Sequence, residues 1–338
     1  MSILASDLIA FASATVSDNP ATNGGRPAAS PLSLNAKNNA FPDVGSAVIE
    51  AGGRAWRKLF LCNASTDNSA GTAARVLLDK PTSYGDYAYF LPGTMEDVES
   101  GISASAPIYG AALLSADAAA GATQITCALE DAALAPMFAA GRRIVLSTRS
   151  GYENTTSSVG VEETAEIASV STSGTTATLT LTKGLANAYT VAAGARASVI
   201  YAPGTTIAPA LTNWQESGSG TYDQSAIVLS NRGTIRQAWT IAYTSATSYT
   251  LTGDTLGLVG TYETTADAAP ANPATYAGGA PYLTIPASGH VAGHAAGDTI
   301  TFVTSPAAIP IWVSRVVPAG TTDMGMSDIP ICWSIESE

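Results

Sequence analysis

Two histidines, His290 and His294, are the first candidates for chemistry, because their i, i+4 spacing suits a metal site. That spacing brings two imidazole rings to the same side only when both lie on a helix. Gly289, Gly293 and Gly297 surround the pair, and glycine disfavours a helix. We therefore interpret the histidines as part of a loop and predict no metal site.

Two clusters of carboxylates, 96–99 and Glu162-Glu163, are the next candidates. Paired carboxylates serve glycoside hydrolysis or calcium binding. Adjacent residues of a strand point to opposite faces, however, and the sequence contains no D-x-D-x-D-G calcium loop. We interpret both clusters as solvated acidic surface.

Nucleophile and phosphate-binding motifs are missing from the sequence, which contains no G-x-S-x-G, Walker or G-x-G-x-x-G pattern. Gly218-Ser219-Gly220 is interpreted as a turn. Cys62, Cys127 and Cys332 form no C-x-x-C pair, and their odd number leaves at least one free thiol, so we expect buried thiols in strands. The sequence thus predicts a non-enzymatic protein without catalytic residues or cofactors.

Aromatic side chains and arginines are the remaining candidates, as residues of an interface. Four of the five tryptophans lie in the last 125 residues, and Trp, Tyr and Arg carry much of the energy of protein interfaces. Ordinary core packing and a platform for sugar rings remain alternatives. The candidate interface residues are Trp214, Tyr222, Tyr276, Tyr282, Trp312 and Arg315.

Charge is scarce in this chain of 338 residues: 12% of the residues are charged, and the net charge is −12. The hydrophobic share of 46% excludes a disordered chain. The acidic balance argues against direct binding of nucleic acid and of anionic membranes. No run of about 20 apolar residues predicts a membrane span, and the start lacks the basic region of a signal peptide, so we expect cytoplasmic synthesis.

The elements that would position these residues are strands, since short alternating or apolar runs end at turn residues throughout. We predict that 55–63 and 73–79 form a hairpin-like pair. We also predict that 163–170 pairs with 176–183 across a five-residue loop, 171–175. In 235–243, the alternation places Ile235, Gln237, Trp239, Ile241 and Tyr243 on one core-facing side.

The predicted fold is all-β, with two or three β-sandwich or small β-barrel domains, an extended N-terminal arm and long loops. The arm spans 1–40 and is interpreted either as a solvated tail or as a contact to a neighbouring subunit. The domains span 41–107, 108–203 and 204–338. The long loop 266–297 is expected to be functional or interfacial by its length.

Several blocks of the sequence resemble structural proteins of tailed-bacteriophage virions. They include YGAALLSADAAAGATQITCALEDAAL, FAAGRRIVLSTRSG, NRGTIRQAWTIAYTSATSYTLTGDTLGLVG and GDTITFVTSPAAIPIWVSRVVPAG, and the likeness covers about residues 40–338. The opening ILASDLIAFASATVSDNPATNGG is similar to the start of such proteins. Similar proteins tend to carry a tryptophan before the GDTI strand, where this chain has the two histidines.

The resemblance implies a virion structural protein of the tail or baseplate, made in the host cytoplasm. Its expected partners are other copies of itself, in a trimer or hexamer ring, and other tail proteins. A subunit of this kind buries uncharged surface against neighbours, which agrees with the scarcity of charge. Three alternatives stay open: a receptor-binding fibre protein that recognises a surface glycan, a capsid decoration or head–tail joining protein, and a virion-associated depolymerase.

Overall fold

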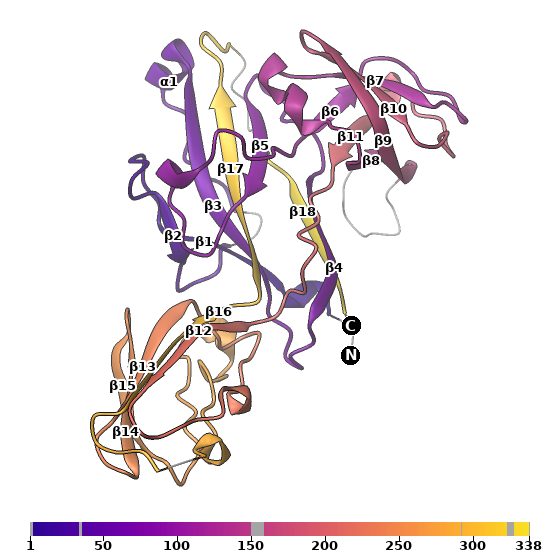
Figure 1. Ribbon diagram of the computed structural model, residues 1–338. Helices are drawn as coiled ribbons and strands as arrows, with labels where there is room; N and C mark the ends of the chain where they lie inside the picture. Colours follow the sequence, from indigo (N-terminus) through magenta and orange to yellow (C-terminus); the bar gives the residue numbers. More distant parts are fainter. Residues whose placement is uncertain (1–2, 34–35, 150–158, 292, 323–327, 338) are drawn as a thin grey trace.

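The computed structural model describes residues 3–33, 36–149, 159–291, 293–322 and 328–337. It is built almost entirely of strands, with 44% strand and 9% helix, so the predicted all-β class is confirmed. Three β bodies make up the molecule: the barrel lies beside one end of the central sheets, and the C-terminal sheet lies at their other end (Figure 1). They are a barrel, a central pair of sheets and a C-terminal sheet covered by loops on one face.

The central sheet has the strand order β2-β1-β3-β17-β5. Strand β17 lies antiparallel between β3 and β5, so a strand from near the C-terminus completes the sheet begun at the N-terminus. Eight consecutive residues of β3, 56–63, are buried, which requires packing on both faces and strands on both edges. The strands are β1 (Leu8–Thr15), β2 (Gly24–Pro27), β3 (Gly53–Asn63), β5 (Tyr87–Pro92) and β17 (Ala308–Val317).

A second central sheet consists of β4 (Gly71–Leu78) and β18 (Ile331–Ser337). Its apolar side chains, such as Val76 and Ile335, share one buried cluster with Phe90 of β5 and Ile311 of β17. The hairpin predicted for 55–63 and 73–79 is therefore wrong. Strands β3 and β4 lie in different sheets: β3 pairs with β1 and β17, whereas β4 pairs with β18.

The barrel is closed by six strands in the order β10-β7-β6-β11-β8-β9. Ile125, Leu146, Ile167 and Leu179 fill its interior without exposure to solvent beyond 2%. The strands are β6 (Ala111–Leu114), β7 (Gln124–Ala128), β8 (Arg143–Ser147), β9 (Glu162–Ser173), β10 (Thr176–Leu181) and β11 (Arg196–Val199). The sequence predicted this module as a barrel or sandwich, and the structure is a barrel.

The hairpin between β9 and β10 forms as predicted, but its loop is shorter. Ser173 pairs with Thr176, so the loop is the two residues Gly174 and Thr175 rather than 171–175. Gly174 has a φ of +57°, which suits the first loop position of a tight hairpin turn. The tight turn lets the two strands pair to their ends.

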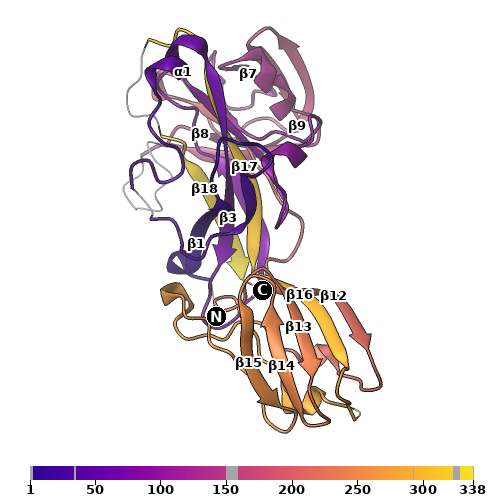
Figure 2. The ribbon, with the colours of Figure 1, turned by 90° about the vertical axis from the view of Figure 1, so that its left-hand side faces the viewer.

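The C-terminal sheet has the order β12-β16-β13-β14-β15. Its inner face packs under loops that include Leu283 and Ile285, whereas its outer face is bare (Figure 2). Gln237, Trp239, Ile241 and Tyr243 are buried on the inner face, as the alternation predicts. The strands are β12 (Ala210–Ser217), β13 (Gln237–Tyr243), β14 (Ser248–Gly253), β15 (Gly257–Glu263) and β16 (Thr299–Ser305).

Helical segments are short. The α-helix α1 spans Ser46–Ala51, and the other helical segments are 3-10 turns. These are η1 (Ala5–Asp7), η2 (Glu99–Gly101), η3 (Ala132–Met137), η4 (Val191–Ala193), η5 (Gln224–Ala226), η6 (Thr275–Ala277) and η7 (Ala287–Gly289).

Two of the predicted domain limits differ from the sheets. Segment 1–40 is not a separate arm, because β1 pairs with β3 over five residues and β2 extends the same sheet. The end of the predicted C-terminal domain, 204–338, also belongs elsewhere, since β17 and β18 complete the central sheets. Composition marks the turn-rich segment 17–39 but carries no signal for strand partners that lie 47 to 266 residues apart, as Ala12 and Leu59 or Gly71 and Ser337 do.

Candidate interaction sites and domain joints

The acidic segment 96–99 contacts strands β3 and β17 of the central sheet and also the residue just before β13 in the C-terminal sheet. Asp97 accepts hydrogen bonds from the buried Lys58 Nζ at 2.7 Å and from Trp312 Nε1 at 2.7 Å. Lys58 Nζ also donates to the carbonyl oxygens of Gly25 and Asp97, at 2.7 and 2.9 Å. All three ammonium hydrogens thus have acceptors, as a charged lysine in an apolar interior requires.

Burial and pairing act against each other at this ion pair. Burial alone would raise the pKa of the Asp97 carboxyl, but the hydrogen bonds from Lys58, Trp312 and Thr94 outweigh it and lower the pKa. Burial lowers the pKa of Lys58, and Asp97 offsets part of that change. The geometry supports the charged pair.

Glu96 connects the N-terminal segment to the C-terminal sheet. Its carboxylate accepts hydrogen bonds from Arg26 Nε at 2.8 Å and from Arg236 Nη2 at 2.7 Å. Arg26 also forms a two-pronged pair with Asp254, at 2.9 and 2.5 Å. The hydrogen bond from Arg236 is the largest cause that lowers the pKa of Glu96, and that from Arg26 is the largest for Asp254.

The interpretation of 96–99 as solvated acidic surface is therefore wrong. Glu99 joins the same joint, because its carboxylate accepts a 2.7 Å hydrogen bond from Asn23 Nδ2. The partners Asn23, Lys58 and Arg236 lie 38 to 140 residues away from the segment. Spacing within the segment cannot reveal partners at such distances.

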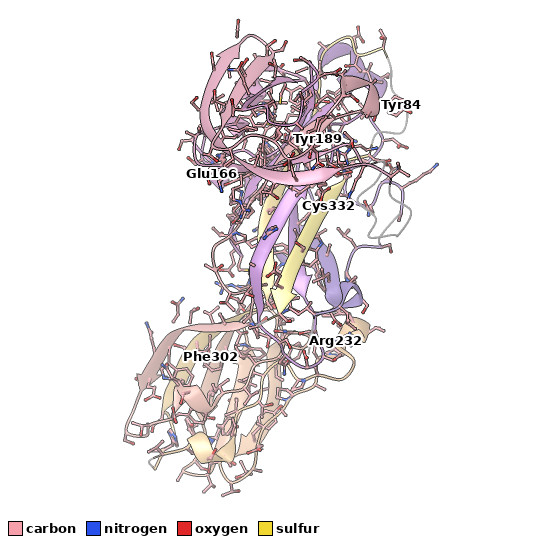
Figure 3. All side chains as sticks on the ribbon, turned by 90° about the vertical axis from the view of Figure 1, so that its right-hand side faces the viewer. Tyr84, Glu166, Tyr189, Arg232, Phe302 and Cys332 are labelled. Carbon is pink, nitrogen blue, oxygen red and sulfur yellow. The ribbon has the colours of Figure 1, made fainter. Side chains whose placement is uncertain are left out.

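A second contact fixes the C-terminal domain to the central sheets. Asn231 Nδ2 donates to Ser65 Oγ at 2.7 Å and to the Ser69 carbonyl at 2.9 Å, and Arg232 Nε donates to the Ala64 carbonyl at 2.7 Å. Figure 3 shows Arg232 where the C-terminal domain meets the central sheets. The joint thus combines ion pairs on one side with backbone-directed hydrogen bonds on the other.

The barrel is attached by a buried ion pair between Arg196 of β11 and Asp79, which follows β4. Arg196 Nη2 lies 2.6 Å from Asp79 Oδ1, and both side chains are at most 7% exposed. Ser198 Oγ donates to the Asp79 carbonyl at 2.9 Å. The barrel interior also shares a buried cluster with Trp56, Tyr89 and Trp312, so its attachment is apolar as well as ionic.

Three of the predicted interface residues are buried within the chain. Trp312 is 0% exposed and Tyr222 is 5% exposed. Tyr282, at 8%, packs near Trp239 with ring centroids 5.9 Å apart. Their rings are used by the core and offer no accessible face to a partner.

The other three predicted interface residues are half-buried and contact their own chain. Trp214 stacks on Phe302 with centroids 5.2 Å apart, and Tyr276 packs edge-on against Phe11 at 5.0 Å. Arg315 lies over the Phe41 ring at 5.0 Å and donates to the Pro42 carbonyl at 2.9 Å. Tyr276 and Arg315 therefore act between segments of this chain, while Trp214 keeps part of its ring at the edge strand β12.

The two histidines lie in a loop, as predicted, but their rings come together in the C-terminal domain. The His294 ring stacks on Tyr243 at 3.8 Å, and its centroid is 5.4 Å from that of His290. The hydroxyl of Tyr243 is 3.1 Å from His290 Nδ1. Burial, with a smaller contribution from His294, lowers the pKa of His290 to about 4, so the ring is neutral at pH 7.

Metal-binding and thiol chemistry can be examined over the described ranges. There, no group of three or more His, Cys, Asp or Glu side chains is placed to hold a metal ion. The three cysteines are free thiols on β3, β7 and β18, and Cys62 and Cys127 are buried, as predicted. Burial raises the pKa of Cys127 and of the half-buried Cys332 to about 12, so neither thiol is a nucleophile at neutral pH.

The outer sheet face, formed by the side chains of β12–β16 that point away from the covering loops, was not foreseen from the sequence. Its cross-strand rows are Gln215, Thr301, Thr240, Thr252 and Leu258 in one, and Ser217, Thr299, Ala242, Thr250 and Thr261 in the next. A third row begins with Thr212, Val303 and Ala238. All of these side chains are uncharged and at least partly exposed. The alternation of Ala, Thr or Val with large apolar residues in 238–242 and 299–303 was the available signal.

Comparison with known proteins adds no relative: the chain matches no protein-family model and no curated protein. Within the described residues, no helix combines the length and apolar content needed to cross a bilayer.

Proposed function

We propose that the chain is a non-enzymatic structural subunit of a tailed-bacteriophage virion, in a ring of the tail or baseplate. In this role it holds copies of itself and other tail proteins, and its barrel is a candidate attachment point for fibres. The proposal rests on the resemblance of the sequence blocks and on one structural observation, the uncharged outer sheet face. A subunit inside an assembly needs such a face, because the centres of protein interfaces are depleted in charge.

The joints support the same role. Buried ion pairs fix the barrel and the acidic segment to the central sheets, and the pairs Arg236–Glu96 and Arg26–Asp254 tie the C-terminal domain to them. Three bodies held in one arrangement can transmit a defined geometry to neighbouring subunits. The expected partners are other copies in a trimer or hexamer, since closed rotational symmetry is the usual form of such assemblies.

Mass spectrometry of purified particles tests this proposal. The chain should be present in amounts equal to those of other ring proteins, and its absence from the particles would contradict a structural role. Gene order and image reconstruction separate the tail from the head: a capsid decoration or head–tail joining protein would lie beside the portal or the capsid.

One observation favours a second candidate, a receptor-binding protein. The half-buried Trp214 stacks on Phe302 at the edge strand β12, and an indole ring at an edge can stack on a sugar ring. Adsorption of the purified chain to host cells, lost in Trp214→Ala, would support this alternative. Trp312→Ala is no test of it, because Trp312 is completely buried.

A further inference from the structure

We propose that the outer sheet face is a homotypic interface, on which the same face of a second copy of the chain packs across a two-fold axis. The inference does not depend on a virion role, since the pair could form in any setting. It rests on the chemistry, size and position of the face.

The face is neutral to an unusual degree. The five strands that build it contain two charged side chains, Glu216 and Glu263. Glu216 pairs with Ile300 and belongs to the inner side of the sheet, where it accepts hydrogen bonds from Trp214 and Tyr222. Glu263 lies at the last residue of β15, beside Ser248. The centre of the face is thus free of charge.

Two of the charged residues that flank the strands are already neutralised within the chain. Arg236, just before β13, pairs with Glu96, and Asp254, just after β14, pairs with Arg26. A partner of strong charge would find no complementary group on this face. The partner must itself present a flat, neutral surface, and the same face of a second copy meets this requirement.

Threonine suits contact between two identical faces. Its hydroxyl can both donate and accept a hydrogen bond, so threonines from two copies can pair without a fixed donor or acceptor pattern. Ala238, Ala242 and Val303 add flat apolar surface between them. Leu258, which is 66% exposed at the edge strand β15, adds an apolar side chain that water does not favour.

The size of the face suits a small specific interface. Five strands about 4.8 Å apart, with about six residues each at about 3.4 Å per residue, span roughly 24 by 20 Å in plan. Two such faces together come to roughly 1,000 Å², which is the lower end of the total area that a specific interface buries. Two twisted sheets pack face to face at about 10 Å, as in β-sandwiches.

The two-fold axis should pass near Thr240. This residue is at the middle of β13, the middle strand of the sheet, and its row extends to Gln215 on one side and to Leu258 on the other. Residues near a two-fold axis meet their own counterparts. A two-fold pair is also consistent with a ring, because dihedral assemblies combine both kinds of axis.

Charge exchange on the full chain tests the proposal. Sedimentation velocity of the unmodified chain should show a dimer or an even-numbered assembly. Thr240→Asp with Thr301→Asp should give half that size, and so should Thr240→Lys with Thr301→Lys, because each variant repels itself. An equimolar mixture of the two variants should restore the original size, since opposite charges then face each other. Ser169→Asp with Ser171→Asp, on the exposed part of β9, should change nothing.

Several outcomes would overturn the proposal. One is an unmodified chain that is monomeric, and another is an assembly whose size the face variants do not change. The third is a mixture of the two variants that stays dissociated, although each variant keeps the urea-unfolding midpoint of the unmodified chain. Disulfide formation gives an independent reading. In a Cys332→Ser background, Thr240→Cys should form a covalent dimer under mild oxidation, whereas Ser171→Cys should not. If the dimer forms but the chain is absent from particles, only the proposed function fails.

Discussion

Lys58 and Asp97 form an ion pair of 2.7 Å in which the lysine side chain is completely buried. The pair connects strand β3 to the segment that follows β5, and Trp312 of β17 donates to the same carboxylate. Three neighbouring strands of the central sheet thus converge on one carboxyl group. The fold therefore requires both residues, because a buried charge without its partner costs several kcal/mol of stability.

Removal of the Asp97 charge should be strongly destabilising. Asp97→Asn leaves the Lys58 ammonium buried and unpaired, which should lower the free energy of unfolding by about 3–5 kcal/mol. Urea unfolding followed by circular dichroism measures the loss. Glu50→Gln, at an exposed position of α1, is the control and should change stability by less than about 0.5 kcal/mol. The double variant Lys58→Met, Asp97→Asn should be more stable than Asp97→Asn alone; a less stable double variant would refute this explanation.

Glu96→Gln should show a small effect that depends on salt. The substitution breaks the ion pairs with Arg26 and Arg236, whose side chains are partly exposed, so the cost should be about 1 kcal/mol or less. Salt screens the attraction between exposed charges, because the screening length falls as the salt concentration rises. The stability difference from the unmodified chain should therefore shrink when NaCl is raised from about 0.05 to about 0.5 M. An equal difference at both salt concentrations would argue against an electrostatic joint.

Gly233→Ala should destabilise the C-terminal domain. A Cβ at this position would overlap the backbone carbonyl oxygen of Pro281, and a backbone atom cannot move aside as a flexible side chain can. We expect a loss of about 1–3 kcal/mol, the usual cost of overpacking. Gly101→Ala is the matched control, because its Cβ would meet open space without a positive φ. Equal thermal midpoints for the two variants would contradict the predicted overlap.

Stability should fall as the pH drops below about 6.5. The pKa of His290 is about 4 in the folded chain, compared with 6.5 for an ordinary histidine. Above pH 6.5 both states are neutral, so the stability is fully present there. Between pH 6.5 and 4 the unfolded state binds a proton that the folded state does not, and stability is lost. The loss should be on the order of 2 kcal/mol.

Urea unfolding of the unmodified chain and of His290→Gln at pH 7 and pH 4 measures this contribution. The variant lacks the titrating group, so its stability should fall less over the same range. His294, whose pKa burial also lowers, remains in both proteins and acts equally on both. If the free energy of unfolding changed with pH in the same way for both proteins, His290 would not be the cause of the loss of stability.

Local patterns predicted what local interactions determine. The alternation in 235–243 placed the correct side chains in the core, and turn residues marked the strands of the barrel. Pairing over long distances was not predictable in this way. Strand β17 pairs with β3, which lies more than 240 residues earlier, and both strands are apolar on two faces. Other strands of the chain are also apolar on two faces, so this property does not identify the partner.

The surroundings of the candidate site residues could not be predicted for a related reason. Aromatic residue types indicate large buried area but not whether the partner is in the same chain, and Trp312 and Tyr222 found theirs within it. The acidic segment was misjudged because its basic partners are distant in sequence. The scarcity of charge predicted buried uncharged surface, but the outer sheet face was not located, because the strand partners that align its threonine and alanine rows are distant in sequence.

Quantitative mass spectrometry of purified tailed-phage particles whose genome encodes this chain tests the proposed structural role. A ring subunit of the tail should be present in a copy number per particle that is a multiple of three, at a fixed ratio to the other tail proteins. Particles that are complete and infectious but contain no copy of the chain would contradict that role.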